Sequence, residues 1–270
     1  MPFNNVSSKL LHLLTIQVSL TDQIYAAAYG ALSSMGRSYY TAGASRSSIM
    51  SFRERTYTLN GAVLAATGVS DHEAFVRMVE EEFPSSTVEA TAAPAVVTLS
   101  YLGGEARLSA PSTGYTHVAL AFEGPTSSPV MNVLKHCLTM SGVSAFASPG
   151  IMGVYGGCVP GDASATLDGL TKAVVSAPTD AIVAKAKAVA KAEALRTLDA
   201  GSKSLADAMT ASILDSCGFS AKALADSYDA VSSADVSNAY SAMVKSKLSL
   251  AAVGDISNVP YHATIASRFG

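Results

Sequence analysis

The spacing of apolar and polar positions predicts short helices and a strand in the first part of the chain. Apolar residues three and four apart predict a helix over 6–34, and serines lead into a short helix over 45–53. A continuous apolar run over 59–67 predicts a buried strand that ends at Gly68.

A helix is expected to follow this strand and to begin with a capping box. Ser70 is the predicted N-cap and Glu73 stands three residues later, so each side chain can bond to the backbone of the other residue. The helix should run to about Phe83. Its buried positions are predicted to be Phe75, Met78 and Val79.

Residues 84–94 are typical of a linker. They are rich in Ser, Thr, Ala and Pro and show no helical or strand periodicity. We therefore predict a domain boundary there, between residues 1–83 and residues 95–270.

The second region alternates strands and helices and then becomes mostly helical. Two adjacent glycines within 101–107 allow the backbone to turn where a sheet begins. The predicted strands are 95–101, 116–122, 143–147, 151–158 and 248–253. The predicted helices are 127–140, 163–175, 179–199, 202–216, 220–230 and 233–245. This order predicts an α+β fold with a mainly antiparallel sheet, and its near-continuous apolar strands indicate that both faces are covered.

The composition indicates a protein that packs against partners. Apolar residues make up 49% of the 270 residues and charged residues only 14%. A membrane span needs roughly 20 apolar residues in a row, and the best run, 10–20, is interrupted by His12, Gln17 and Ser19. The net charge of −3 provides no basic surface for nucleic acid. The first 50 residues contain one acidic residue, Asp22, which leans toward a mitochondrial targeting composition but also fits a folded helix.

No residues in the chain have the spacing that catalysis, metal binding or cofactor binding requires. The histidines are isolated, and His117, in a predicted buried strand, is expected to be either a residue whose polar atoms are hydrogen-bonded or an interface residue. Glu105 and Arg107 are expected to form a structural ion pair or to lie in a solvated loop. The three cysteines fit neither a disulfide framework nor a zinc site, which favours packed thiols in a reducing compartment: Cys137, Cys158 and Cys217. We predict no catalytic, metal-binding or cofactor-binding residue.

Several motifs, in order, resemble the M16 peptidase-like family. They are QIYAAAY at 23–29, LAATGVSDH at 64–72, YLGGEAR at 101–107 with THVALAFEG at 116–124, VSAFAS at 143–148, ADVSNA at 234–239 and AVGDISNVP at 252–260. The family includes the mitochondrial processing peptidase and the core proteins of respiratory complex III, and the match is best to the core protein 2 type. The resemblance implies M16 (LuxS/metallohydrolase-like) domains. Residues 1–83 would be the C-terminal half of a first domain, and residues 95–270 a complete second domain.

Two departures from the family pattern bear on function. The family's zinc motif, His-x-x-Glu-His, is absent, and no other residue takes its place: Asp22 is assigned no metal role. The short stretch 140–143 leaves no room for the glycine-rich substrate loop of the processing peptidase's non-catalytic subunit. The resemblance therefore implies a subunit that is not itself an enzyme and needs no cofactor.

The implied role is a structural core subunit of complex III, peripheral to the inner mitochondrial membrane on its matrix side. Its expected partners are a core protein 1-like subunit, other complex III subunits and a chain that supplies the missing front half of the first domain. One alternative is a subunit of a heterodimeric mitochondrial processing peptidase. Another is an accessory subunit of a different respiratory or ATP synthase complex.

Overall fold

The computed structural model describes residues 19–38, 43–57, 62–83, 99–125, 127–148, 150–214 and 219–269. The predicted linker 84–94 lies outside the described residues, as do the first parts of the predicted helix 6–34 and of the predicted strands 59–67 and 95–101. The chain divides into two compact units, which are described separately. The first takes its residues from 1–41, 99–190 and 227–270, and the second from 42–98 and 191–226. No helix among the described residues is both long enough and apolar enough to cross a membrane.

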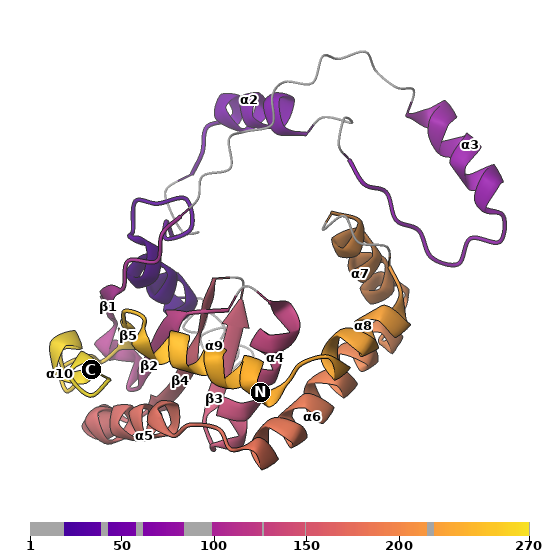
Figure 1. Ribbon diagram of the computed structural model, residues 1–270. Coiled ribbons are helices and arrows are strands. Elements are labelled where there is room, and N and C mark those ends of the chain that lie inside the picture. Colours follow the sequence, from indigo (N-terminus) through magenta and orange to yellow (C-terminus); the bar gives the residue numbers. More distant parts are fainter. Residues whose placement is uncertain are drawn as a thin grey trace, which may run out of the picture. The chain divides into compact units, whose positions relative to one another are not determined.

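The first unit is built on one five-stranded sheet (Figure 1). The strands are β1 (Gly104–Ser109), β2 (Thr116–Glu123), β3 (Ser144–Ser148), β4 (Ile151–Cys158) and β5 (Ser249–Gly254). Their spatial order is β1-β5-β2-β4-β3, and every pair is antiparallel except β1 with β5. The prediction of a mainly antiparallel sheet is confirmed, and β2 to β5 lie within two residues of the predicted strands.

The first strand begins later than predicted. Residues 99–101 belong to no strand, and β1 starts at Gly104, directly after a turn in which Gly103 has a φ of 71° and Gly104 a φ of 142°. The physical reason lies in the helix over 19–29. The Leu102 amide donates to the Ala28 carbonyl at 2.7 Å, so this stretch is held by the helix instead of a neighbouring strand.

Helices cover one face of the sheet. They are α4 (Ser128–Met140), α5 (Ala163–Val175) and α9 (Ser233–Lys245), which contact β2, β3 or β4. Because successive side chains of a strand point to opposite faces, β2 sends Val118, Leu120 and Phe122 to this side, and all three are fully buried. The unit ends with the short helix α10 (His262–Ala266), and single 3₁₀ turns lie at Pro111–Thr113 and Pro160–Asp162.

The helix over 19–29 packs against the opposite face of the sheet. Ile24 and Ala28 share a buried cluster with Ala119 and Ala121 of β2 and with Ala251 of β5. The small alanine side chains leave room for a helix to approach the sheet closely. The expectation that both faces of the sheet are covered is therefore confirmed for these strands, although the sequence did not predict which element would cover the second face.

The second unit contains helices α2 (Arg46–Thr56) and α3 (His72–Glu82), together with α7 (Ser202–Leu214). Helix α6 (Asp180–Asp199) begins in the first unit and ends in the second, and α8 (Ala221–Asp229) runs from the second unit to the first. The predicted helix 45–53 is confirmed as α2, whose N-cap Ser45 accepts from the Ser48 amide at 3.2 Å.

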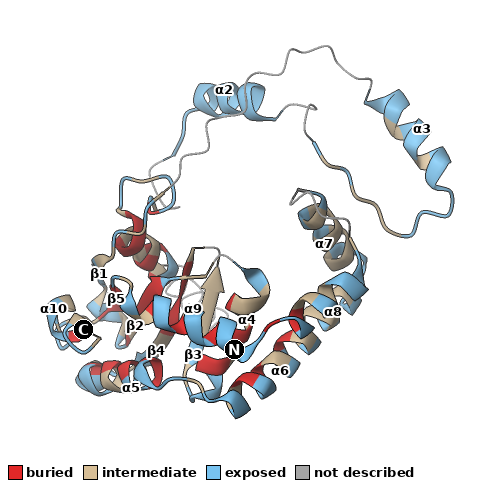
Figure 2. Ribbon diagram, viewed as in Figure 1, coloured by how far each residue is buried: buried red, intermediate tan, exposed pale blue. Residues whose placement is uncertain are grey.

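Three predictions for the second unit were wrong. The described part of the expected strand 59–67 is not paired into any sheet. The N-cap of α3 is Asp71, not Ser70, because the Asp71 carboxylate accepts from the Ala74 amide at 3.0 Å and is favoured at a helix N-terminus. Helix α3 buries none of its residues, since no described element of this unit covers its apolar positions (Figure 2).

Candidate interaction surface

The described residues contain no cluster of histidine, cysteine, aspartate or glutamate that could hold a metal ion. His72 is exposed at the start of α3, and His12 lies outside the described residues. Asp22 is buried in the helix over 19–29, where its carboxylate accepts a hydrogen bond from the Ser38 hydroxyl. This bond to a loop hydroxyl gives Asp22 a structural partner.

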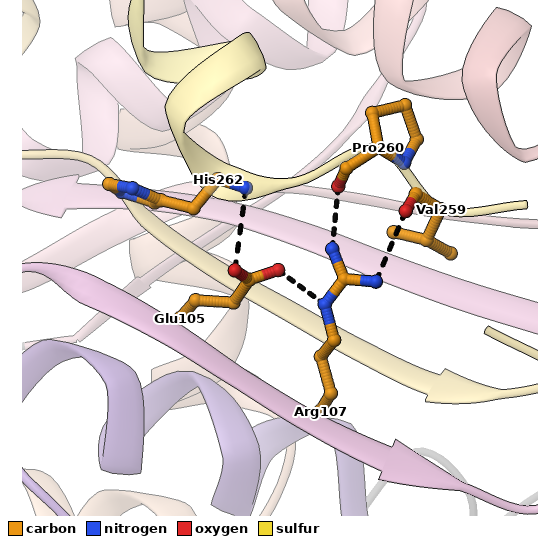
Figure 3. Close-up of polar contacts among 5 residues, drawn as sticks. All are labelled: Glu105, Arg107, Val259, Pro260 and His262. Atoms are coloured by element: carbon orange, nitrogen blue, oxygen red, sulfur yellow. Dashed lines mark hydrogen bonds and ion pairs between the residues drawn. The ribbon is translucent and has the colours of Figure 1, made fainter. Parts of the chain in front are cut away.

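Glu105 and Arg107 join the edge strand β1 to the C-terminal segment (Figure 3). The two side chains form an ion pair, and the Arg107 guanidinium donates to the carbonyls of Val259 at 3.1 Å and Pro260 at 2.6 Å. The guanidinium carbon also lies 5.2 Å from the centre of the Tyr261 ring, within cation–π range. The ion pair is therefore present, and these contacts hold strand β1 against residues 259–261.

His262 is held in place by two hydrogen bonds in the same region. Its backbone amide donates to Glu105 at 3.4 Å, and its Nε2 lies 2.9 Å from the Leu248 carbonyl. Because a carbonyl only accepts, Nε2 carries the proton in this contact. His262 also lines a cavity of about 530 Å³, together with Ser246, the exposed residues Lys245 and Lys247, glycines and apolar residues. His262 is therefore used to hold two segments together.

His117 has an unusual environment in β2. Its Nε2 is buried and has no hydrogen-bond partner among the residues that the structure describes. Its ring lies against Gly157 of β4, where an added Cβ would meet Nδ1 at 3.0 Å. Burial lowers the pKa of His117 from its ordinary value of 6.5, so the neutral ring is favoured. The residue as a whole is half-buried, and the prediction of a hydrogen-bonded histidine is not met at Nε2, which bonds to no described group. An interface role for His117 stays a prediction.

A group of tyrosines lies between the helix over 19–29 and the sheet. The Tyr29 hydroxyl donates to the Gly150 carbonyl at 3.0 Å, and the Tyr101 hydroxyl bonds to Ser249 at 2.7 Å. The two rings meet edge to face with centroids 5.7 Å apart. Burial is the main cause that raises the pKa of Tyr101 far above its ordinary value, so this phenol stays protonated. These bonds were not predicted, because their acceptors lie far away in the sequence.

A cavity of about 300 Å³ opens beside these tyrosines. It is lined by Leu20, Thr21, Ile24 and Tyr25 of the helix and by Ala119, Ala145, Phe146, Ser148 and Tyr155 of the sheet. Its walls are mainly aliphatic and aromatic, and the hydroxyls are its polar groups. None of the described residues that line it carries a carboxylate, an imidazole or a thiol.

The thiols are spread through the structure. Cys137 is buried in α4 and Cys158 is half-buried at the end of β4, and both are free. Burial raises the pKa of Cys137 to about 11, which keeps it protonated and unreactive. Cys217 lies outside the described residues.

The second unit presents the largest group of exposed apolar side chains along one stretch of sequence. They are Ile49, Met50, Phe52, Tyr57, Leu64, Val69, Val76, Met78 and Phe83. Helix α2 is exposed along its whole length, as Figure 2 shows. Exposed apolar side chains in such number are typical of surfaces that bind a partner. We call residues 46–57 and 62–83 the apolar segment of the second unit, and it is the best candidate for a functional surface.

Comparisons with known proteins bear on the fold. No protein-family model matches the chain, and no curated protein matches it by sequence. Among solved structures, it is similar to a chain of complex III2 from Candida albicans with Inz-5 bound. The two are 17% identical, with a TM-score of 0.78, and the match spans 93% of this chain and 70% of that chain. The predicted resemblance to complex III is therefore confirmed at the level of the fold.

Proposed function

We propose that this chain is a non-catalytic structural subunit of mitochondrial respiratory complex III, of the core protein 2 type. The observation that carries the proposal is the fold that it shares with a complex III chain over 93% of its length. By this proposal it has M16-like domains, with residues 1–83 forming the C-terminal half of the first and residues 95–270 the second. It lies on the matrix side of the inner membrane.

The polar groups of the described residues support a structural role. The Glu105–Arg107 pair is bonded to backbone carbonyls of the same chain. The Nε2 atom of His117 is buried with no polar partner in the described part of the chain, and burial lowers the pKa of the ring. A general acid or base needs a substrate within hydrogen-bond reach, and neither group lines either of the two cavities described above. These groups serve packing.

The exposed apolar surface supports a role within a larger assembly. Phe52 is 51% exposed, Met78 is 54% exposed and Phe83 is 53% exposed, all within the apolar segment of the second unit. Side chains of this size usually lie in cores or at interfaces. The partners that we propose are a core protein 1-like subunit, other complex III subunits and a chain that supplies the front half of the first domain.

Native gel electrophoresis of mitochondrial extracts tests this proposal. A tagged form of the chain should migrate with cytochrome b and cytochrome c1, and mass spectrometry of the same band should find a core protein 1-like subunit. Migration with a different respiratory complex or with ATP synthase would refute the complex III assignment.

A second assay separates the structural role from a peptidase role. The purified assembly is incubated with a precursor protein, with and without a zinc chelator. If the chain belongs to an assembly with a structural role only, the precursor should remain uncleaved in both samples. Cleavage that the zinc chelator abolishes would favour the processing peptidase alternative instead.

A further inference from the structure

A short apolar stretch of the second unit has the features of an unpaired strand. Residues 62–66, with the sequence Ala-Val-Leu-Ala-Ala, run as an extended trace ahead of α3 (Figure 1). They belong to no helix or sheet, and no backbone hydrogen bond joins them to another described residue. Backbone amides and carbonyls in folded proteins are nearly always paired, with protein or with water. Within the part of the chain that the structure describes, the backbone groups of these five apolar residues pair with no other backbone group.

The burial of residues 62–65 alternates as it does along a strand, whereas Ala66 is half-buried like Ala65 before it. Ala62 and Leu64 are exposed, whereas Val63 and Ala65 are half-buried. Leu64 is 58% exposed. In a strand, successive side chains point to opposite faces of the sheet, so Leu64 would lie on the face opposite to Val63 and Ala65. An exposed, apolar strand edge of this kind is a template for pairing with another chain.

Helix α3 follows at once and also lacks a covering layer. Its apolar residues Phe75 and Val79 stand four positions apart and are only half-buried, and Met78 beside them is exposed. An amphipathic helix of a soluble protein normally places such a stripe against another layer. One sheet could satisfy both elements: its edge would pair with the extended stretch 62–66, and its apolar face would cover the stripe of α3.

The charge of α3 restricts the kind of sheet that fits. The helix sequence HEAFVRMVEEE contains four glutamates and one arginine, with Glu80, Glu81 and Glu82 at its C-terminal end. Acidic side chains at the border of an apolar stripe favour a partner with basic residues at the matching border. The surface thus combines an unpaired strand, an apolar stripe and an acidic rim.

We propose that residues 62–66 add as a strand to the edge of a β-sheet in a different polypeptide. Helix α3 then packs on an apolar face of that sheet, and basic residues of the partner lie beside its glutamates. The recognition is β-strand addition, in which main-chain hydrogen bonds provide affinity and alternate side chains provide specificity. A second copy of this chain would bring two acidic α3 helices to one surface, so the charge favours a different polypeptide. The proposal deepens the proposed function and rests on it only for the identity of the assembly.

Hydrogen exchange measured by mass spectrometry tests the strand pairing directly. The tagged chain is purified within its native assembly and, for comparison, as the isolated full chain. Amides of residues 62–66 should exchange at least about 100-fold more slowly in the assembly, because strand pairing protects amide hydrogens. The peptide that contains β2 (Thr116–Glu123) serves as the control and should be protected in both samples. Equal exchange of residues 62–66 in the two samples would refute the proposal.

Substitutions then distinguish main-chain pairing from side-chain contact. Proline removes the N–H group, and successive N–H groups of a strand point to opposite edges. One of the variants Val63→Pro and Leu64→Pro should therefore lower incorporation into the assembly by about tenfold or more, as expected from losing a ladder bond. Leu64→Thr keeps the N–H and a strand-forming side chain, and it should lower incorporation by less than about threefold.

The outcomes separate failure of this proposal from failure of the proposed function. Protection of residues 62–66 in an assembly other than complex III would support strand addition and refute the complex III role. If the chain is found in complex III but residues 62–66 are unprotected there, the complex III role would be supported and strand addition refuted. Protection in an isolated chain that forms dimers by light scattering would identify a second copy as the partner and refute the choice of a different polypeptide. The β2 peptide also reports whether each variant is folded.

Discussion

Replacing Ile24 with alanine tests whether the helix over 19–29 is part of the sheet's core. Ile24 is 2% exposed and packs in a cluster with Ala119 and Ala251. The substitution removes three buried carbon atoms, which at about 0.8 kcal/mol each costs roughly 2.4 kcal/mol of transfer free energy. Ile24 also lines the cavity of about 300 Å³, so the neighbours cannot easily close the new space. We expect the free energy of unfolding to fall by about 3 kcal/mol, within the usual range for such a change.

Urea unfolding followed by tyrosine fluorescence measures this loss. The chain has no tryptophan, and Tyr25 and Tyr29 lie in or beside the same cluster, so the signal reports on this interface. Ile24→Val should cost about 0.5–1.5 kcal/mol, because it removes one carbon atom. Leu32→Ala is the matched control: Leu32 is 89% exposed, and its loss should change stability by less than about 0.5 kcal/mol.

The comparison with the control decides the outcome. If Ile24→Ala destabilises the chain no more than Leu32→Ala, the helix does not share the core of the sheet. That face of β2 and β5 would then be free to contact another subunit, and the packing described for the first unit would be wrong.

Three further predictions concern single polar groups. Arg107→Ala should lower the free energy of unfolding by about 1–3 kcal/mol in the same urea assay, because two carbonyls and Glu105 lose their charged donor; an unchanged midpoint would contradict the assigned contacts. Burial lowers the pKa of His117, so its stabilising effect is present above pH 6.5 and is lost as the pH falls through the lower folded-state pKa. The stability of the native chain should therefore decrease more below pH 6.5 than that of His117→Gln, and parallel pH profiles would refute this. Iodoacetamide at pH 8 should label Cys158 at least about tenfold faster than buried Cys137, as followed by mass spectrometry, and equal rates would exclude the protected thiol.

Local sequence signals predicted most elements of the first unit. The apolar run of β2 and the helix α4 lie within one or two residues of their predicted ranges, because each is specified by its own periodicity and termini. The strand order was not predictable in the same way. Strand β5 lies between β1 and β2, and this long-range pairing leaves no local trace. Helix α10 (His262–Ala266) was missed because five residues are too few to show a period.

The candidate surface shows the same division. Glu105 and Arg107 were expected to form an ion pair or to lie in a solvated loop, and the structure shows the pair. The Val259 and Pro260 carbonyls that accept from Arg107 could not be predicted, since every residue has a carbonyl. In the second unit, the strand predicted at 59–67 has the right composition but no partner among the described residues. Periodicity predicts what a segment can form, and a partner decides whether it does.

The position of β5 has a consequence for how the protein is made. Strand β1 pairs with β5 and has no other described neighbour in the sheet, so it can join the sheet only after the last strand has left the ribosome. The Arg107 contacts to Val259 and Pro260 come later still. Until then the backbone groups of β1 have no partner strand. Its exposed edge can be shielded only by the helix over 19–29 or by chaperones. Synthesis that stops before Ser249 should therefore produce a chain whose other strands pair while β1 remains open to proteases.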